Sequence, residues 1–159
     1  MTKIYTCILI ISLIANSAKT LTPAASCFNI GHLDTITRSI CEKRNKNYLV
    51  LAFLSPDCHS CERNIAQFKR LEREIYNFAH ARVVSLGALQ ETRRFIERHA
   101  LGTEVALDSG GRALRAYGVH RVPTIFVIDA HNRIVHQSTN NLSNAEINII
   151  STLVQKPVI

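Results

Sequence analysis

The stretch LVLAFLSPDCHSC, residues 49–61, decides the fold of this chain. Six consecutive apolar residues, 49–54, predict a buried strand, and the Ser-Pro-Asp that follows predicts the turn that leaves it. An amphipathic helical pattern comes next, so Cys58 is expected in the first turn of a helix. Two residues separate Cys58 from Cys61, which brings the second sulfur within bonding distance of the first. The stretch therefore predicts a strand, a turn and a helix that begins at a pair of cysteines.

The position of Cys58 indicates its chemistry. Backbone N–H groups in the first turn of a helix lack intrahelical partners and carry a positive partial charge, so they stabilise a thiolate relative to a thiol. The thiolate is the nucleophile in disulfide exchange, and cysteines at such positions have pKa values of roughly 3.5 to 7.5, compared with about 8.5 for a free thiol. We therefore expect Cys58 to attack a disulfide and Cys61 to resolve the product.

Composition is that of an ordinary globular domain. The chain has 159 residues, 47% of them hydrophobic, which suits a single domain with its own core. The formal net charge is +7, and this basic balance favours acidic partners or an anionic membrane surface, or serves solubility alone. Aromatic residues make up only 6% of the chain, too few for a platform on which bases stack, so nucleic-acid binding is not expected.

The N-terminal residues have the pattern of a secretory signal. Lys3 precedes an apolar stretch, residues 4–15, and small residues follow up to Ala18. This order predicts export with removal of residues 1–18. The alternative is an uncleaved anchor, although the apolar stretch is shorter than the roughly 20 residues that cross a bilayer comfortably. We expect an N-terminal extension over 19–32 and a folded domain over 33–156.

Export would change the interpretation of the other cysteines. Loss of Cys7 with the signal leaves Cys27, Cys41, Cys58 and Cys61, an even number that favours pairing in an oxidising compartment. With Cys58 and Cys61 as the redox pair, Cys27 and Cys41 would form a structural disulfide. The alternative is a buried, free Cys41.

The remaining chain alternates between helical and strand patterns. Helices are predicted over 33–44, from Cys58 to Phe78, and over 90–100, 113–117 and 144–155. Strands are predicted over 48–54, 81–86, 104–107, 124–128 and 134–137, the last two as a hairpin. Ser143 and Glu146 match a capping box before the last helix. This order of elements predicts an α/β fold, a three-layer α/β/α sandwich with a central mixed sheet.

The dithiol at a helix start, together with Val122-Pro123-Thr124 at the start of a later strand, resembles the thioredoxin fold. The chain is also similar to the exported TlpA/ResA-like thiol:disulfide oxidoreductases, through Ala106-Leu107-Asp108, Ala116-Tyr117-Gly118-Val119 and Pro123-Thr124-Ile125-Phe126-Val127-Ile128-Asp129. The resemblance covers about residues 47–137, and the combination of motifs is specific where a lone Cys-x-x-Cys is not.

The resemblance implies a thioredoxin-like domain with a cis peptide bond at Val122–Pro123 that faces the dithiol. The missing N–H of proline would leave neighbouring backbone groups free to pair with an extended substrate segment, so Val122 and Pro123 are candidate substrate-binding residues. His120 either contacts substrate or only caps its loop. The resemblance also implies a location in the bacterial periplasm, or a membrane anchor with the domain outside the cytoplasm.

Several positions depart from the family pattern. The buried acid that thioredoxin carries six residues before its first cysteine is replaced here by Ala52, so any acid or base that assists Cys61 comes from elsewhere, with Asp57, His59 and Glu62 nearest in sequence. Cytochrome-maturation relatives often have Gly and Glu where this chain has Arg121 and Thr124, so a dedicated haem-pathway role is not expected.

Redox tuning is assigned to His59, Ser60 and Asp57. A protonated His59 would stabilise the Cys58 thiolate, whereas Asp57 would repel it, so these residues leave the direction of electron flow open. The family resemblance favours a reductase.

The leading hypothesis is an exported enzyme that exchanges disulfides with protein substrates through a mixed disulfide on Cys58. It would need an upstream redox partner protein but no cofactor besides its own redox-active disulfide, no metal, and no membrane unless the N-terminal segment is retained. The alternatives are a copper-binding chaperone of the same fold, in which two thiolates and a histidine suit Cu(I), and an interaction protein without enzymatic activity. Peroxidase chemistry is disfavoured because no Thr stands three residues before Cys58.

Overall fold

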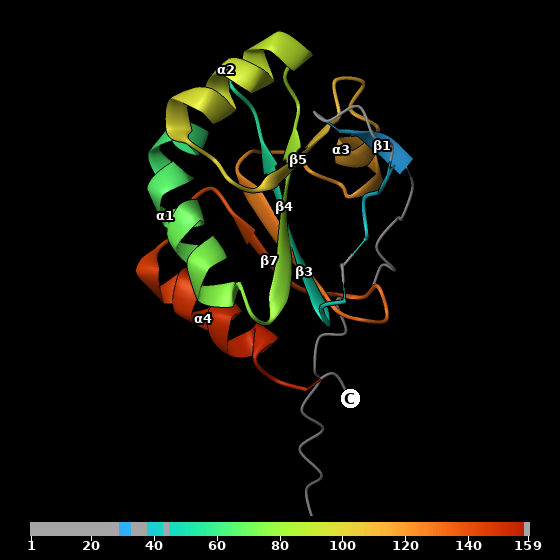
Figure 1. The fold of residues 1–159 in the computed structure, drawn as a ribbon, viewed down its shortest axis with the longest axis vertical. Coiled ribbons are helices and arrows are strands. Elements are labelled where there is room, and N and C mark those ends of the chain that lie inside the picture. Colours follow the sequence, from blue (N-terminus) through green and yellow to red (C-terminus); the bar gives the residue numbers. More distant parts are fainter. Residues whose placement is uncertain (1–28, 33–37, 43–44, 158–159) are drawn as a thin grey trace, which may run out of the picture.

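The computed structural model describes residues 29–32, 38–42 and 45–157. The elements in these residues are, in chain order, β1 (Asn29–His32), β2 (Arg38–Ser39), β3 (Tyr48–Leu54), α1 (His59–Ile75), β4 (Ala79–Ser85), α2 (Leu89–His99), β5 (Glu104–Leu107), α3 (Arg112–Ala116), β6 (Thr124–Ile128), β7 (Ile134–Thr139) and α4 (Asn144–Val154) (Figure 1).

The described strands form one mixed sheet in the order β2-β1-β5-β4-β3-β6-β7. The central strands β5, β4 and β3 run parallel, whereas β1, β6 and β7 each pair antiparallel with a neighbour. All seven residues of β3 are buried, as expected for an apolar run paired on both edges. The turn that leads to the dithiol begins at the end of this buried strand.

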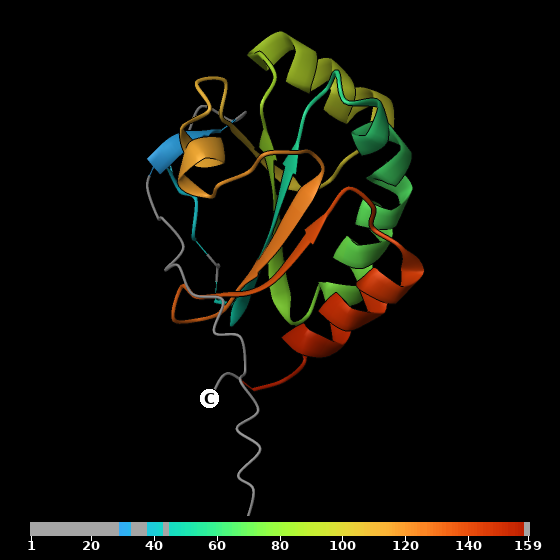
Figure 2. The same ribbon diagram turned by 180° about the vertical axis from the view of Figure 1, so that it is seen from behind.

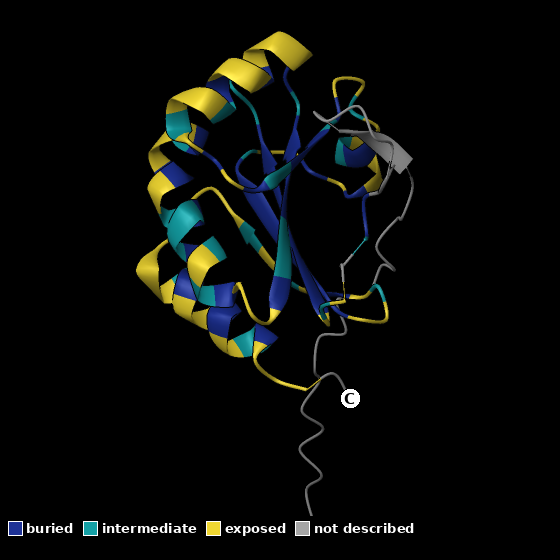
Figure 3. Cartoon of the chain, in the orientation of Figure 1, coloured by how far each residue is buried: buried dark blue, intermediate teal, exposed yellow. Residues whose placement is uncertain are grey.

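Helices cover both faces of the sheet. Helices α1, α2 and α4 lie on one face and α3 lies on the other, as the two opposite views show (Figures 1 and 2). Alternate residues of β3 enter two separate cores: Val50, Ala52 and Leu54 lie on the α1 side, and Leu49, Leu51 and Phe53 lie on the α3 side. The buried residues follow the strands and the inner faces of the helices (Figure 3). The predicted three-layer α/β/α sandwich is confirmed.

Most of the predicted elements are confirmed to within two residues. The bounds of β3, β5 and β6 are those expected, and β6 and β7 pair antiparallel as predicted. At the start of α4 the Ser143 hydroxyl accepts a hydrogen bond from the Glu146 N–H over 3.2 Å. These predictions hold because they depend on apolar spacing and capping within short windows of sequence.

Two predictions about element bounds are wrong. Arg38–Ser39, inside the helix predicted over 33–44, is the strand β2, which pairs with β1. Ile40 and Cys41, from the same predicted helix, are buried in the α3-side core and lie on non-helical backbone. Helix α1 ends at Ile75, and Phe78, predicted on its buried face, is 40% exposed in the turn before β4.

The N-terminal predictions fall largely outside the described residues. This applies to the signal or anchor over 1–18, to Cys27 and to most of the extension, so the pairing of Cys27 with Cys41 stays a prediction. The end of the extension is β1, which pairs with β5. Cys41 is buried, and its Sγ lies 3.6 Å from the Tyr117 hydroxyl. Within the described residues, no helix has the length and apolarity to cross a membrane.

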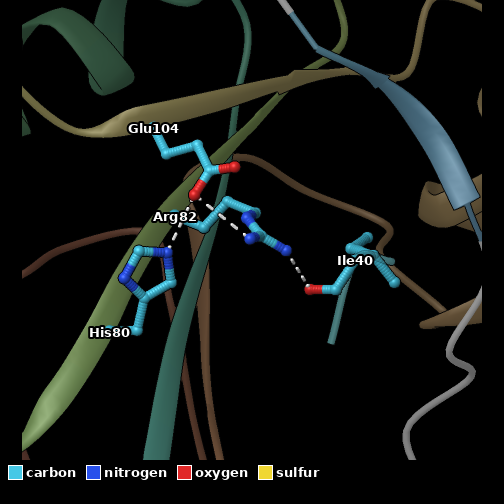
Figure 4. A network of polar contacts seen from close by, with 4 residues as sticks. All are labelled: Ile40, His80, Arg82 and Glu104. Atoms are coloured by element: carbon cyan, nitrogen blue, oxygen red, sulfur yellow. Dashed lines mark hydrogen bonds and ion pairs between the residues drawn. The ribbon is translucent and has the colours of Figure 1, made fainter. Parts of the chain in front are cut away.

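A buried arginine connects three segments on the α3 side of the sheet. Arg82 of β4 is fully buried, and its Nη1 donates a 2.8 Å hydrogen bond to the carbonyl oxygen of Ile40. Its Nη2 donates over 3.2 Å to Oε2 of Glu104, on the neighbouring strand β5 (Figure 4). His80 Nε2 lies 2.9 Å from the same carboxylate oxygen. Arg82 thus ties the segment before β3 to the centre of the sheet.

A buried carboxylate closes the β6–β7 turn, and we expect Asp129→Asn to lower the free energy of unfolding by about 1–2 kcal/mol at neutral pH. Asp129 accepts hydrogen bonds from the backbone N–H groups of His131 and Arg133, both 2.9 Å, and a 2.6 Å bond from Arg133 Nε. Burial by itself would raise the pKa of Asp129, but these bonds hold the pKa below its usual value.

The sign of the pH dependence follows from that lowered pKa. The carboxylate stabilises the fold above its unfolded-state pKa of about 3.9, and the contribution disappears as the pH falls through the lower folded-state value. Urea unfolding at pH 7 and at pH 3 should therefore show a difference between wild type and Asp129→Asn that shrinks in acid. The exposed Asp57 provides the control, because Asp57→Asn should change stability little at either pH. Equal losses from the two variants would contradict the role given to Asp129.

Candidate active site

Cys58 lies at the N-cap of α1, one residue before the first helical residue, rather than inside the first turn. The turn that leaves β3 is closed by a 3.1 Å hydrogen bond from the Cys58 N–H to the Ser55 carbonyl oxygen. The Cys58 Sγ accepts a 3.0 Å hydrogen bond from the backbone N–H of Cys61. This is the contact that an N-cap side chain makes with an otherwise unpaired helix donor, here made by sulfur. The sequence therefore places a sulfur where backbone N–H groups favour negative charge.

Cys58 and Cys61 form a disulfide, with their Cα atoms 5.1 Å apart. The two cysteines differ in access, since Cys58 is half-buried and Cys61 is fully buried on the inner face of α1. An incoming thiol or disulfide can therefore reach Cys58 more easily than Cys61. The assignment of Cys58 as the attacking residue and Cys61 as the resolving residue stays a prediction.

The loop before β6 meets the dithiol. The carbonyl oxygen of Val122 lies 3.5 Å from Cys58 Sγ, and the peptide bond between Val122 and Pro123 is cis. The Ser60 hydroxyl lies 3.3 Å from Cys58 Sγ and donates a hydrogen bond to the Val122 carbonyl, also over 3.3 Å. The structure thus brings together Cys58, Ser60, Val122 and Pro123, although Cys58 and Pro123 are 65 positions apart in the sequence.

A buried asparagine, not singled out from the sequence, fixes the other side of the site. Asn64 Nδ2 donates to the carbonyl oxygen of Ser60 over 2.7 Å, and Asn64 Oδ1 accepts a 2.8 Å bond from the Leu142 N–H. Asn140 N–H in turn donates to the Pro123 carbonyl over 2.9 Å. The loop between β7 and α4 is therefore held against both α1 and the proline, and it lines a small hollow beside Cys61. The sequence signal for this role was a polar residue, Asn64, directly before the apolar Ile65 in an amphipathic helical pattern.

The other predicted site residues lie at the surface. His59, Asp57 and His120 are all exposed, and no hydrogen bond or ion pair from their side chains is found among the residues that the structure describes. Their assigned roles in tuning or substrate binding stay predictions. Glu62, a candidate acid or base, lies instead with Oε1 3.5 Å from His99 Nε2 and 3.7 Å from Arg98 Nη1. Ala52 is fully buried in the same core as Cys61.

A Cu(I) site of the kind considered above would need a histidine beside the dithiol, but His131 and His136 lie elsewhere in the fold. His136 is paired with Glu146 at the start of α4, and His131 is exposed in the β6–β7 turn. In the described part of the chain, no cluster of three or more His, Cys, Asp or Glu residues is arranged to hold a metal ion.

Pro56 packs against Gly87, and Gly87→Ala is expected to lower the free energy of unfolding by about 1–3 kcal/mol. A Cβ atom at residue 87 would lie 2.6 Å from Cδ and Cγ of Pro56. The proline ring cannot move away without shifting the turn that positions Cys58 at the start of α1. Disulfide exchange should therefore become slower as stability is lost. Urea unfolding and the exchange rate measure the two effects.

Gly102→Ala is the matched control for this substitution. A Cβ atom at residue 102 meets no heavy atom within 4 Å, so the change should stay within about 0.5 kcal/mol. If the two alanine variants unfold at the same urea concentration, the contact between Pro56 and Gly87 does not hold the turn.

Comparison with known proteins identifies the family. The sequence pattern of the AhpC/TSA family matches residues 24–137, and the chain belongs to that family. Among curated relatives, it is 27% identical over 96 residues to the thiol-disulfide oxidoreductase ResA of Halalkalibacterium halodurans, a match that covers 58% of this chain and 54% of that protein. It is 30% identical over 91 residues to ResA of Bacillus anthracis, covering 55% and 51%. The chain spans about half the length of the curated relatives it matches.

Solved structures show the same fold. A thiol-disulfide oxidoreductase from Bacteroides fragilis superimposes with a TM-score of 0.73 at 18% identity, over 82% of this chain and 99% of that one. StoA from Bacillus subtilis superimposes with a TM-score of 0.67 at 20% identity, over 84% and 100%. The predicted resemblance to ResA-like proteins of thioredoxin fold is confirmed.

Proposed function

We propose that this protein is a thiol:disulfide oxidoreductase that acts on protein substrates through Cys58 and Cys61. The observation that carries the proposal is the hydrogen bond from the Cys61 N–H to Cys58 Sγ at the start of α1. Cys58, which accepts it, is half-buried, whereas Cys61 is fully buried. The names of the ResA relatives support the same activity.

In the reducing direction, the Cys58 thiolate attacks a substrate disulfide. One S–S bond forms between Cys58 and the substrate, the substrate S–S bond breaks, and the departing substrate thiolate takes up a proton. The Cys61 thiol then loses its proton and attacks Cys58 Sγ, which releases the second substrate thiolate and forms the Cys58–Cys61 disulfide. Two electrons pass from the dithiol to the substrate, and an upstream redox partner protein must return two electrons before the next turnover.

The surroundings of the dithiol assist each step. Because the Val122 carbonyl lies 3.5 Å from Cys58 Sγ, an extended substrate segment that pairs with this backbone would present its sulfur to Cys58. The Ser60 hydroxyl contacts both the carbonyl and the sulfur, so it can donate to the thiolate once the disulfide is reduced. The hydrogen bond from the Asn140 N–H to the Pro123 carbonyl holds the loop between β7 and α4 beside the cis proline.

We propose reduction as the physiological direction and export as the destination. The first rests on the resemblance to ResA-like proteins, and the second rests on the signal-like pattern of residues 1–18, with the periplasm or a membrane anchor as the two locations. The reduction potential decides the direction. A value near the −270 mV that is typical of thioredoxin supports reduction, and one near about −120 mV indicates an oxidant.

Turnover of a protein disulfide tests the activity itself. Purified protein with dithiothreitol as the electron source should accelerate reduction of the interchain disulfides of insulin, and the Cys58→Ser/Cys61→Ser double variant should fall to the background rate. A double variant that keeps the wild-type rate would overturn the proposal and leave a non-enzymatic interaction protein as the better explanation.

A further inference from the structure

Two exposed arginines lie on the two segments that meet at the dithiol, Arg63 on α1 and Arg121 in the loop before β6. Arg63 lies four residues after His59 on α1, so the two side chains share one face of the first helical turns. Arg121 directly precedes Val122, whose carbonyl oxygen lies 3.5 Å from Cys58 Sγ. Both arginines are exposed, and neither guanidinium forms an ion pair or hydrogen bond among the described residues. Their charge is therefore available to a partner.

Of the two carboxylates nearest to Cys58 in the sequence, Glu62 is paired with basic side chains, whereas Asp57 forms no ion pair with the other described residues. Glu62 is held by Arg98 and His99, at 3.7 Å and 3.5 Å. Asp57 is the remaining carboxylate in the turn before Cys58. The loops at 86–88 and 139–142 contribute no charged residue, and the N-terminus of α1 adds its own positive partial charge. Among the described residues of the turn before Cys58, the first turns of α1 and the loop before β6, Arg63 and Arg121 therefore stand against one carboxylate without an ion-pair partner, that of Asp57. The surface around Cys58 thus carries a net positive charge.

We propose that this surface selects substrate proteins in which acidic residues flank the reactive cysteine. The inference rests on the proposed oxidoreductase function and names its substrate class. In the mixed disulfide the substrate chain must pass Cys58 and Val122, which places its neighbouring residues between Arg121 and Arg63. Guanidinium groups bind carboxylates through paired hydrogen bonds, so Glu or Asp beside the substrate cysteine is stabilised there and Lys is repelled.

Three peptides provide the test. Each contains one cysteine joined as a disulfide to 2-mercaptoethanol, and the residues on both sides of that cysteine are Glu, Gln or Lys. The reduced protein should react in the order Glu, Gln, Lys, with about a tenfold difference in second-order rate constant between Glu and Lys at low salt. The difference should fall below about twofold in 0.5 M salt, because exposed charges are screened there. Equal rates, or a preference for Lys, would overturn the proposal.

Variants separate the local surface from the net charge of the chain. Arg63→Gln and Arg121→Gln should each reduce the ratio of the Glu to the Lys rate, and the double variant should bring the ratio close to one. Arg73→Gln removes the same charge from the same helix, about 15 Å further along α1, and should leave the ratio near the wild-type value. An equal reduction from Arg73→Gln would assign the preference to the overall charge and contradict the proposed surface.

The neutral peptide distinguishes the two proposals. If the wild-type protein reduces the Gln peptide but shows no preference among charges, the substrate class is wrong and the oxidoreductase function stands. If it reduces none of the three peptides, both proposals fail.

Discussion

Cys58→Ser is expected to reduce turnover of protein disulfides to the background rate, whereas Cys61→Ser should capture substrates as stable mixed disulfides. The difference follows from the geometry of the pair. Cys58 is the half-buried sulfur that accepts the Cys61 N–H at the start of α1, so its loss removes the nucleophile. Cys61 is fully buried and can reach only Cys58, so its loss blocks resolution and leaves the first intermediate in place.

Non-reducing electrophoresis after incubation with a disulfide-bonded protein measures this difference. The Cys61→Ser variant should shift to the mass of a covalent complex that dithiothreitol dissociates, and the Cys58→Ser variant should not. The double variant controls for capture by any other cysteine of the chain. Capture by Cys58→Ser instead of Cys61→Ser would reverse the roles, and equal capture by both would contradict the account of unequal access.

Arg82→Met should lower the free energy of unfolding by about 3–5 kcal/mol, the largest effect on stability that we expect from a single substitution. Arg82 is fully buried, and the change removes the donor to the Ile40 carbonyl together with the cation beside Glu104 (Figure 4). The side chain of Glu104 is only 12% exposed, so water cannot fully replace the lost partner. Guanidinium chloride unfolding gives the measurement.

Arg70→Met is the matched control, because Arg70 also pairs with a glutamate but does so at the surface. Its Nε lies 2.8 Å from Glu74 Oε1, with the arginine side chain 42% exposed. Exposed pairs of this kind contribute about 0–1 kcal/mol, so the loss should be several times smaller than for Arg82→Met. Similar losses from the two variants would show that Arg82 does not hold the segment before β3.

The sequence was sufficient for those parts of the fold that depend on local spacing. The apolar run of β3, the helical period of α1 and the hairpin of β6 and β7 are each set within windows of about a dozen residues. The reactive pair was predicted for the same reason, because Cys58 and Cys61 lie at one strand-to-helix turn.

Contacts between distant segments could not be predicted in this way. Asn64 reaches Leu142, 78 residues away, and Arg82 reaches Ile40, 42 residues away. In the sequence, Asn64 and Arg82 stand out only as polar residues within patterns that are otherwise buried. Such a pattern does not indicate which distant residue the side chain contacts. The prediction of a helix is wrong at Arg38–Ser39 for a related reason, because these two polar residues form β2 by pairing with β1, a partner that their own sequence does not indicate.

The central claim is that the start of α1 holds the sulfur of Cys58 as a thiolate, and the rate of alkylation of the reduced protein as a function of pH tests it most directly. Iodoacetamide reacts with the thiolate alone. Because Cys58 is half-buried whereas Cys61 is fully buried, Cys58 should react first. The account predicts a rate that has reached its plateau by about pH 7.5. A rate that keeps rising through about pH 8.5, as for a free thiol, would contradict it.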